Sequence, residues 1–184
     1  MKKLLIANSK GGSSKSTLAL SLAYCLAQNY KVCLLDIDPQ GSINNFKQYV
    51  GVDVVDTLNA NYDVALIDSP PYLTSQLPEL IKSADYVLIP CRPNYFDALA
   101  LGGIAQMLGG KKAGIVLVQA QHRVNITDVL DTLKEYGIPI IKQSMTQRVA
   151  YARVAMQNLF ETDDVKAQKE ILSIVLEIFS AING

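Results

Sequence analysis

Short apolar runs recur along this chain, and segments whose apolar residues repeat with helical spacing lie between most of them. The runs are rich in Val, Ile and Leu and lack the polar alternation of a half-exposed strand, so they predict strands buried on both faces of a parallel sheet. The predicted strands are 3–8, 32–36, 62–68, 86–90, 114–119 and 138–141. The predicted helices are 15–28, 75–83, 97–108, 126–136, 147–158 and 164–182.

This alternation predicts an α/β fold: a single domain over residues 1–184, with a doubly wound, mostly parallel sheet and helices on both faces. The length of 184 residues and the hydrophobic fraction of 49% fit one such domain with a substantial core. No apolar run reaches the ~18 residues of a membrane span, and the first residues are interpreted as a strand rather than a signal peptide. Because parallel strands end at one edge of the sheet, functional residues are expected at the strand C-termini.

The segment KGGSSKST, residues 10–17, follows the first predicted strand and opens the first predicted helix. Gly11 and Gly12 allow backbone N–H groups to turn inward, and the helix N-terminus adds a partial positive charge, so the loop predicts a P-loop for nucleotide phosphates. Lys15 is placed to reach the β- and γ-phosphates of ATP, and the Ser16 hydroxyl to bind Mg²⁺. Thr17 is expected to contact the α-phosphate or to cap the helix.

This loop departs from the common pattern GxxxxGK[ST], because Asn8 and Ser14 stand where that pattern has glycine. A serine can fit at position 14 if its φ is negative. On the loop alone, a Gly/Ser turn with two chance lysines remains an alternative. The additional lysine, Lys10, changes this interpretation, because KGGxxK[ST] resembles the deviant Walker A box of the ParA/MinD family of ATPases. That resemblance implies that Lys10 reaches across a dimer interface to the ATP of a partner chain.

Acidic residues follow the second and third predicted strands. In DIDPQG, the carboxylates of Asp36 and Asp38 point the same way, and an Asx-turn before Pro39 is the alternative to a functional role. The DxDPQG run also resembles the ParA-like chains, which implies that Asp38 positions the attacking water and Mg²⁺, with Asp36 further from the ion. Asp68 ends the apolar run VALI and resembles a Walker B aspartate.

Two later segments extend the resemblance over nearly the whole chain. Residues 84–103 resemble the ADxVLIPxxPxxxD stretch of the family, although a strand followed by a helix capped near Asn94 also explains them. Residues 146–161 resemble the short, ParF-like plasmid-partition ATPases. The resemblance implies catalytic roles for Lys10, Lys15 and Asp38; nucleotide binding by Lys10, Gly11, Gly12, Ser13, Ser14, Lys15, Ser16, Thr17 and Asp68; and Mg²⁺ ligation by Ser16, Asp38 and Asp68.

The resemblance also implies a function: a cytoplasmic ATPase of weak intrinsic activity that forms an ATP-dependent sandwich homodimer and binds DNA non-specifically. Such proteins segregate or position a plasmid, a chromosome or a protein cargo such as carboxysomes, through a ParB-like or adaptor protein that stimulates hydrolysis. A net charge of zero gives little support for DNA binding. The candidate phosphate contacts are Lys111, Lys112, Arg123, Arg148 and Arg153, with solvated surface residues as the alternative. His122 is interpreted as a loop histidine, although related proteins have a residue near this position close to the adenine.

Two other classes share the P-loop. A MinD-like membrane-associated regulator needs a basic amphipathic C-terminal helix, whereas the tail has an apolar face and no lysine after Lys169, which favours core packing and no membrane contact. A metabolic P-loop enzyme of the iron–sulfur type needs paired cysteines, and Cys91 lacks a second cysteine near the strand ends.

Overall fold

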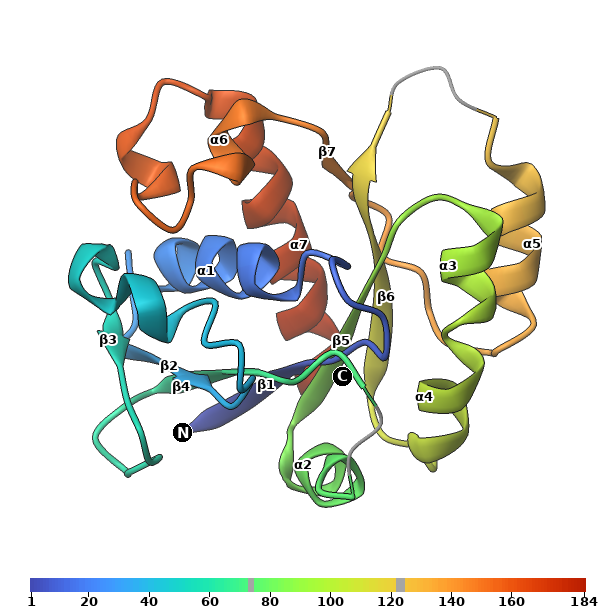
Figure 1. The fold of residues 1–184 in the computed structure, drawn as a ribbon, viewed down its shortest axis with the longest axis horizontal. Coiled ribbons are helices and arrows are strands. Elements are labelled where there is room, and N and C mark those ends of the chain that lie inside the picture. Colours follow the sequence, from blue (N-terminus) through green and yellow to red (C-terminus); the bar gives the residue numbers. More distant parts are fainter. Residues whose placement is uncertain (73–74, 122–124) are drawn as a thin grey trace.

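The computed structural model describes residues 1–72, 75–121 and 125–184. Its centre is a seven-stranded sheet in the order β3-β2-β4-β1-β5-β6-β7, and every paired neighbour is parallel (Figure 1). The strands are β1 (Lys2–Ile6), β2 (Val32–Asp36), β3 (Asp53–Val54), β4 (Val64–Asp68), β5 (Tyr86–Cys91), β6 (Ala113–Ala120) and β7 (Met145–Thr146). Continuous burial along β4 and β5 explains their unbroken apolar sequences.

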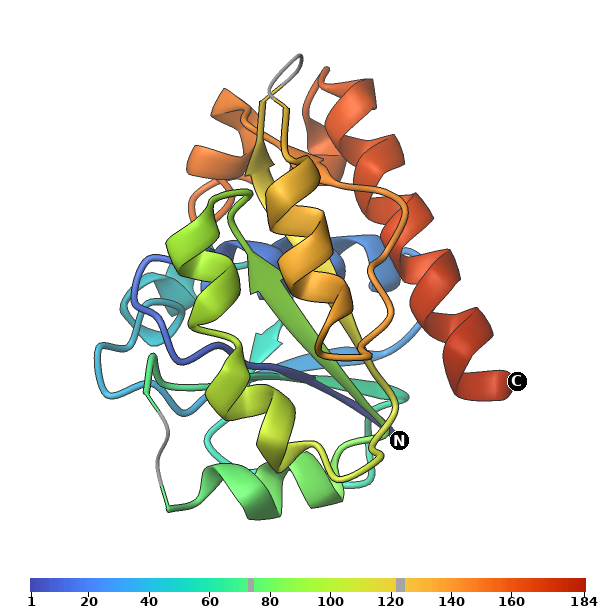
Figure 2. The ribbon, with the colours of Figure 1, turned by 90° about the vertical axis from the view of Figure 1, so that its right-hand side faces the viewer.

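Helices cover both faces of this sheet, as Figures 1 and 2 show. One face carries α1 (Lys15–Leu26), α6 (Val149–Ala152) and α7 (Val165–Asn183), and the other carries α2 (Leu77–Ser83), α3 (Tyr95–Leu99), α4 (Gly102–Met107) and α5 (Thr127–Lys134). Two 3₁₀ segments, Asn44–Tyr49 and Leu159–Glu161, complete the regular structure of the described residues. Each face has its own apolar core, so the predicted α/β fold with helices on both faces is confirmed.

The C-terminal helix α7 packs into the molecule along its apolar stripe. Ala167, Ile171, Ile174 and Ile178 are buried in the same core as α1. This agrees with core packing as the role of the stripe. Among the described residues, no helix has both the length and the apolar character needed to cross a membrane.

Several elements differ from the predictions. Residues 138–141 do not form a strand: Ile140 makes one isolated bridge to Ile115, because Pro139 has no N–H for a ladder. The edge strands β3 and β7 were not predicted, since each has two residues. The predicted helix 97–108 is divided between α3 and α4 near two glycines, and 147–158 is α-helical only in α6.

The strand order reverses at β1, because β4 and β2 lie on one side of it and β5 and β6 on the other. The register aligns Ile6 with Asp68, and Asp68 with Asp36, so three strands end at the same level. The loop after β1 therefore lies at the point of an open α/β sheet where a crevice for ligands forms.

Candidate nucleotide-binding site

The loop between β1 and α1 depends on two residues in the left-handed backbone region. Gly12 has a φ of +68°, and a Cβ there would lie 3.1 Å from the Arg92 guanidinium. Ser14 has a φ of +65°, so it does not adopt the negative φ at which a serine fits without strain. Its hydroxyl accepts a hydrogen bond of 2.9 Å from the amide of Gln119, which itself has a φ of +55°. This long-range bond offsets part of the strain of a serine at a glycine position.

Lys15 is the first residue of α1 and is buried beneath the loop, with 6% of its surface exposed. Burial lowers the pKa of its ammonium, while the nearby charges of Asp68 and Asp38 act in the opposite direction. Among the described residues, the ion pairs within 4.0 Å do not include Lys15. A buried cation without a close anionic partner is costly, so this site favours a negatively charged ligand.

Asp68 ends β4 directly beside the start of α1. The Ser16 hydroxyl donates a hydrogen bond of 2.5 Å to Oδ2 of Asp68, whereas Oδ1 is buried without a partner among the described atoms. Burial raises the pKa of Asp68 to about 7, and the hydrogen bond from Ser16 acts against this increase. A hydroxyl and a carboxylate with a free oxygen are oxygen donors of the kind that Mg²⁺ prefers, so these residues fit a magnesium ion and its bound water.

The two carboxylates after β2 have different surroundings. Asp36 accepts hydrogen bonds from the backbone N–H groups of Asp38, Ile43 and Asn44 at 2.9–3.1 Å, so it fixes the loop that follows the strand. Among the described residues, the Asp38 carboxylate accepts one hydrogen bond, from the backbone N–H of Gln40 at 2.9 Å, and Asp38 lies beside the phosphate loop. Each carboxylate therefore forms an Asx-turn with the backbone N–H group two residues further on. Asp38 also borders the hollow beside the loop.

Two adjoining hollows outline the space for a ligand. All predicted loop residues from Gly11 to Thr17 line a hollow of about 420 Å³, together with Asp38. A second hollow of about 410 Å³ shares Ser14, Thr17 and Gln119 with the first and continues toward α6. Both volumes lie in the range of small-molecule sites. Lys10 lines neither hollow. Asp68 does not line the first hollow itself, but it is hydrogen-bonded to Ser16, which does.

Lys10 instead points to the segment that follows β5. Its ammonium forms a hydrogen-bonded ion pair with the carboxylate of Asp97, in the first turn of α3. Asn94 caps this helix by accepting a hydrogen bond of 2.9 Å from the backbone N–H of Asp97. The predicted helix cap is thus observed, and its helix carries Asp97 to the side of the loop.

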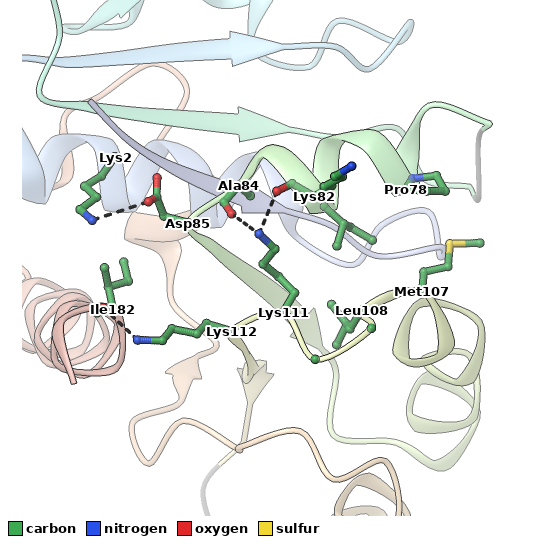
Figure 3. A pocket seen from close by; sticks show the side chains of 13 residues that line it. Lys2, Pro78, Lys82, Ala84, Asp85, Met107, Leu108, Lys111, Lys112 and Ile182 are labelled. Atoms are coloured by element: carbon green, nitrogen blue, oxygen red, sulfur yellow. Dashed lines mark hydrogen bonds and ion pairs between the residues drawn. The ribbon is translucent and has the colours of Figure 1, made fainter.

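The four candidate DNA contacts among the described residues do not gather at one place. Lys111 and Lys112 directly precede β6, at the N-terminal ends of the strands and away from the loop, beside a hollow of about 570 Å³ (Figure 3). There Lys111 donates to the carbonyl groups of Lys82 and Ala84 at 2.8 Å, and Lys112 donates to that of Ile182 at 3.0 Å. Both lysines therefore interact with the C-terminal ends of helices, α2 and α7.

Arg148 is not available as a free phosphate contact. Its guanidinium lies 3.0 Å from Oε1 of Glu170 and 3.5 Å from Asp164, with 19% of the side chain exposed. Glu170 also accepts hydrogen bonds from Thr146 and from the Tyr151 hydroxyl. Arg153 is exposed and lies in the chain between Ala152 and Val154, which line the first hollow. Arg123 and His122 lie outside the described residues.

Cys91, the last residue of β5, is fully buried. Burial raises the pKa of its thiol to about 12. Such a cysteine is protonated at neutral pH and acts as a small apolar residue.

Sequence reasoning did not identify Gln119, Arg92 or the structural role of Asp36. Arg92 donates to the carbonyl oxygen of Gly12, and its neighbour two residues on, Asn94, caps α3. The contacts of Arg92 and Gln119 join residues 80 and 105 positions apart, so a local motif contains no signal for them. The contacts of Asp36 are local and follow the DIDPQG run that the sequence displays.

A parallel sheet with a glycine-containing loop at its reversal point, a buried lysine at the start of α1 and an aspartate at the end of β4 defines a P-loop nucleotide-binding protein. The profile of the CobQ/CobB/MinD/ParA nucleotide binding domain matches residues 4–160. The chain belongs to this family.

Similar proteins include partition and positioning proteins. The chain is 26% identical over 182 residues to "Maintenance of carboxysome distribution protein A" of Halothiobacillus neapolitanus, covering 85% of this chain and 84% of the relative. It is 26% identical to "Protein ParA" of Rhizobium radiobacter, over 83% and 81% of the two chains. A plasmid partition protein of Borrelia burgdorferi, solved with AMPPNP, has a TM-score of 0.77 at 22% identity, over 97% and 98% of the chains. The resemblance to ParA-type proteins is confirmed.

Proposed function

We propose that this protein is a partition or positioning ATPase that binds Mg²⁺–ATP in the two adjoining hollows. The observation that carries this proposal is the buried Lys15 ammonium, which lacks a close carboxylate among the described residues and lies at a helix N-terminus. The phosphate chain of a nucleotide supplies the anion that this position lacks. The adjacent hollow, lined by Gln119, Thr146 and Gln147, then receives the nucleoside.

The residues of this chain have separate roles in the proposed hydrolysis. Lys15 and the backbone N–H groups of the loop hold the phosphates and stabilise the charge that develops on them. Ser16 and Asp68 hold Mg²⁺, which supplies charge neutralisation when bound, and Asp38 completes its surroundings. Asp38 also orients the attacking water, because its carboxylate borders the hollow and accepts only one backbone hydrogen bond among the described residues.

Binding and hydrolysis can be tested separately with two substitutions. Lys15→Ala should weaken binding of a fluorescent ATP analogue by at least about 100-fold, because a buried charge–phosphate contact is lost. Asp38→Ala should retain binding but lower phosphate release by at least about 100-fold. Lys2→Ala, at the N-terminal end of β1 and away from the loop, is the matched control. Equal nucleotide affinity of Lys15→Ala and the wild type would refute the proposal.

We further propose that nucleotide binding assembles a homodimer in which Lys10 of each chain contacts the nucleotide of the other. A second protein then stimulates hydrolysis and links the dimer to a cargo, a plasmid or a protein assembly such as those named for the relatives. The support is the family membership and the position of Lys10, which lines neither hollow of its own chain. Loss of analogue-dependent dimers in Lys10→Ala, with nucleotide binding retained, is the expected result.

Non-specific DNA binding belongs to the same proposal. It predicts retention on arbitrary duplex DNA that requires an ATP analogue and decreases steeply with salt. Arg153 is the described candidate that remains exposed beside the nucleotide site. No retention of the dimer at ~50 mM salt would remove DNA from the proposed function and leave nucleotide binding unaffected.

A further inference from the structure

Asp97 is a buried carboxylate with one cation beside it. Its side chain is 3% exposed, and it lies in the first turn of α3. Among the described residues, the hydrogen bond that its carboxylate accepts comes from the ammonium of Lys10. A carboxylate at this depth is costly without a cation, so Asp97 depends on Lys10.

Lys10 depends much less on Asp97. Its side chain is 42% exposed, so water can solvate the ammonium when it leaves the carboxylate. Its backbone N–H is held separately, through a hydrogen bond of 2.9 Å to Oδ1 of Asn8. The side chain can therefore move while the backbone of the loop stays in place. The energetic cost of moving Lys10 falls almost entirely on the carboxylate that it leaves.

The segment that carries Asp97 is fixed to the same loop at other points. The side-chain amide of Asn8 donates to the carbonyl oxygen of Pro90 at 2.6 Å, and the Ser9 hydroxyl donates to that of Ala100 at 3.0 Å. These contacts surround the ion pair and keep Asp97 at a constant position next to the loop. Asp97 cannot follow Lys10 outward without breaking them.

We propose that Asp97 is a latch that holds Lys10 on its own chain and opposes dimer formation. This inference rests on the proposed function, in which Lys10 extends to a nucleotide bound by a second copy. Extension leaves Asp97 buried without its cation, and a symmetric dimer incurs this cost twice. The latch keeps the protein monomeric until a bound nucleotide offers Lys10 a stronger anionic partner.

Substitution of Asp97 by asparagine separates the latch from the fold. The asparagine side chain has the same shape, leaves the backbone N–H bonded to Asn94, and bears no charge that must stay paired. We expect Asp97→Asn to lower the dimer dissociation constant at least about tenfold in the presence of Mg²⁺ and a non-hydrolysable ATP analogue, because neither chain then leaves a buried charge unpaired. Asp85→Asn is the control, since Asp85 also pairs with a lysine, Lys2, but at the N-terminal ends of the strands, away from the loop.

Sedimentation equilibrium of the full chain gives the dissociation constants, and nucleotide affinity is measured on the same samples. The double variant Lys10→Ala/Asp97→Asn should lose the gain, because the benefit acts through Lys10. A second readout is the acetylation rate of Lys10 in the nucleotide-free monomer, followed by mass spectrometry. It should increase severalfold in Asp97→Asn and stay constant in Asp85→Asn.

An unchanged or higher dissociation constant in a folded Asp97→Asn variant would overturn the latch and leave the proposed dimer intact. Nucleotide binding without dimers in every variant would overturn the dimer and the latch together. Absence of nucleotide binding would refute the proposed function itself. If Asp97→Asn does not fold, the reference is Lys47, which is exposed and lies outside the ion pairs of the described residues. Equal acetylation rates of Lys10 and Lys47 in the wild-type monomer would then overturn the latch.

Discussion

Replacing Asp68 by asparagine should stabilise the nucleotide-free protein, although it removes a residue of the candidate site. The Asp68 carboxylate is fully buried at the end of β4, and its Oδ1 has no hydrogen-bond partner among the described atoms. Burial is the largest cause of its raised pKa of about 7, and repulsion from Asp36 and Asp38 adds to it. Asparagine keeps the shape and the acceptor for Ser16 while removing the buried charge.

The size of this effect follows from the pKa. An increase from 3.8 to about 7 is about three units, or ~4 kcal/mol of unfolding free energy at about 1.4 kcal/mol per unit. A carboxyl group with a raised pKa in the folded state binds more protons when folded, so its contribution is complete below pH 3.8 and is lost as the pH rises through about 7. The asparagine of Asp68→Asn does not ionise, so the stability of this variant does not fall as the pH rises through this range. Its advantage should grow from ~1.5 kcal/mol at pH 5 to ~4 kcal/mol at pH 8.

Urea denaturation at several pH values, in EDTA and without nucleotide, measures this difference. Asp36→Asn is the matched control, because the Asp36 carboxylate accepts three backbone hydrogen bonds. That variant should be destabilised by ~1–3 kcal/mol, since the amide group faces backbone donors with a donor of its own. A pH-independent difference between Asp68→Asn and the wild type, or a loss of stability at pH 8, would refute the reasoning.

Three further predictions test particular contacts. Ser14→Gly should be more stable than Ser14→Ala by ~1 kcal/mol in urea denaturation. Both variants lose the hydrogen bond to Gln119, but only glycine adopts the positive φ without strain. Equal stability of the two variants would contradict this. Arg148→Met should lower the unfolding free energy by ~3 kcal/mol, because it leaves Glu170 buried without its cation. If stability is unchanged and only the salt dependence of DNA binding changes, Arg148 is a phosphate contact after all. Native protein at pH 8 should react slowly with iodoacetamide, because burial raises the pKa of all three thiols. Unfolding in urea should accelerate the reaction. Rapid labelling of Cys91 without urea would contradict this.

The central strands were predictable and the edge strands were not, for one physical reason. The strands β1, β4 and β5 are buried on both faces, so each is a continuous apolar run that the sequence displays. The edge strands β3 and β7 have two residues each and pair on one side only. Their position depends on the strand beside them. The apolar run at 138–141 misled the prediction, because apolarity records burial and not the hydrogen-bond donor that Pro139 lacks.

The candidate site was predictable where its residues are close in sequence. The loop from Lys10 to Thr17 and the strand-end aspartates are local features, and the parallel fold brings them together. The positive φ of Ser14 and its bond to Gln119 depend on a contact between positions 105 apart, which no local pattern encodes. Lys10 shows the same limit. The motif indicates that this lysine is important, whereas its attachment to Asp97 is visible only in the folded chain.

The buried charges of Lys15 and Asp68 destabilise the ligand-free protein, and the same charges favour binding of a nucleotide with Mg²⁺. Lys15 and Asp68 are both buried with incomplete partners, and a nucleotide with Mg²⁺ supplies an anion to the first and a hydrated cation to the second. Ligand binding then stabilises the fold by RT ln(1 + [L]/Kd). Asp68→Asn should consequently raise the melting temperature of the free protein and reduce the increase that Mg²⁺–ATP produces. The melting temperature of the free protein should therefore rise while the increase caused by Mg²⁺–ATP becomes smaller. A substitution that merely improves packing would leave the increase caused by Mg²⁺–ATP unchanged.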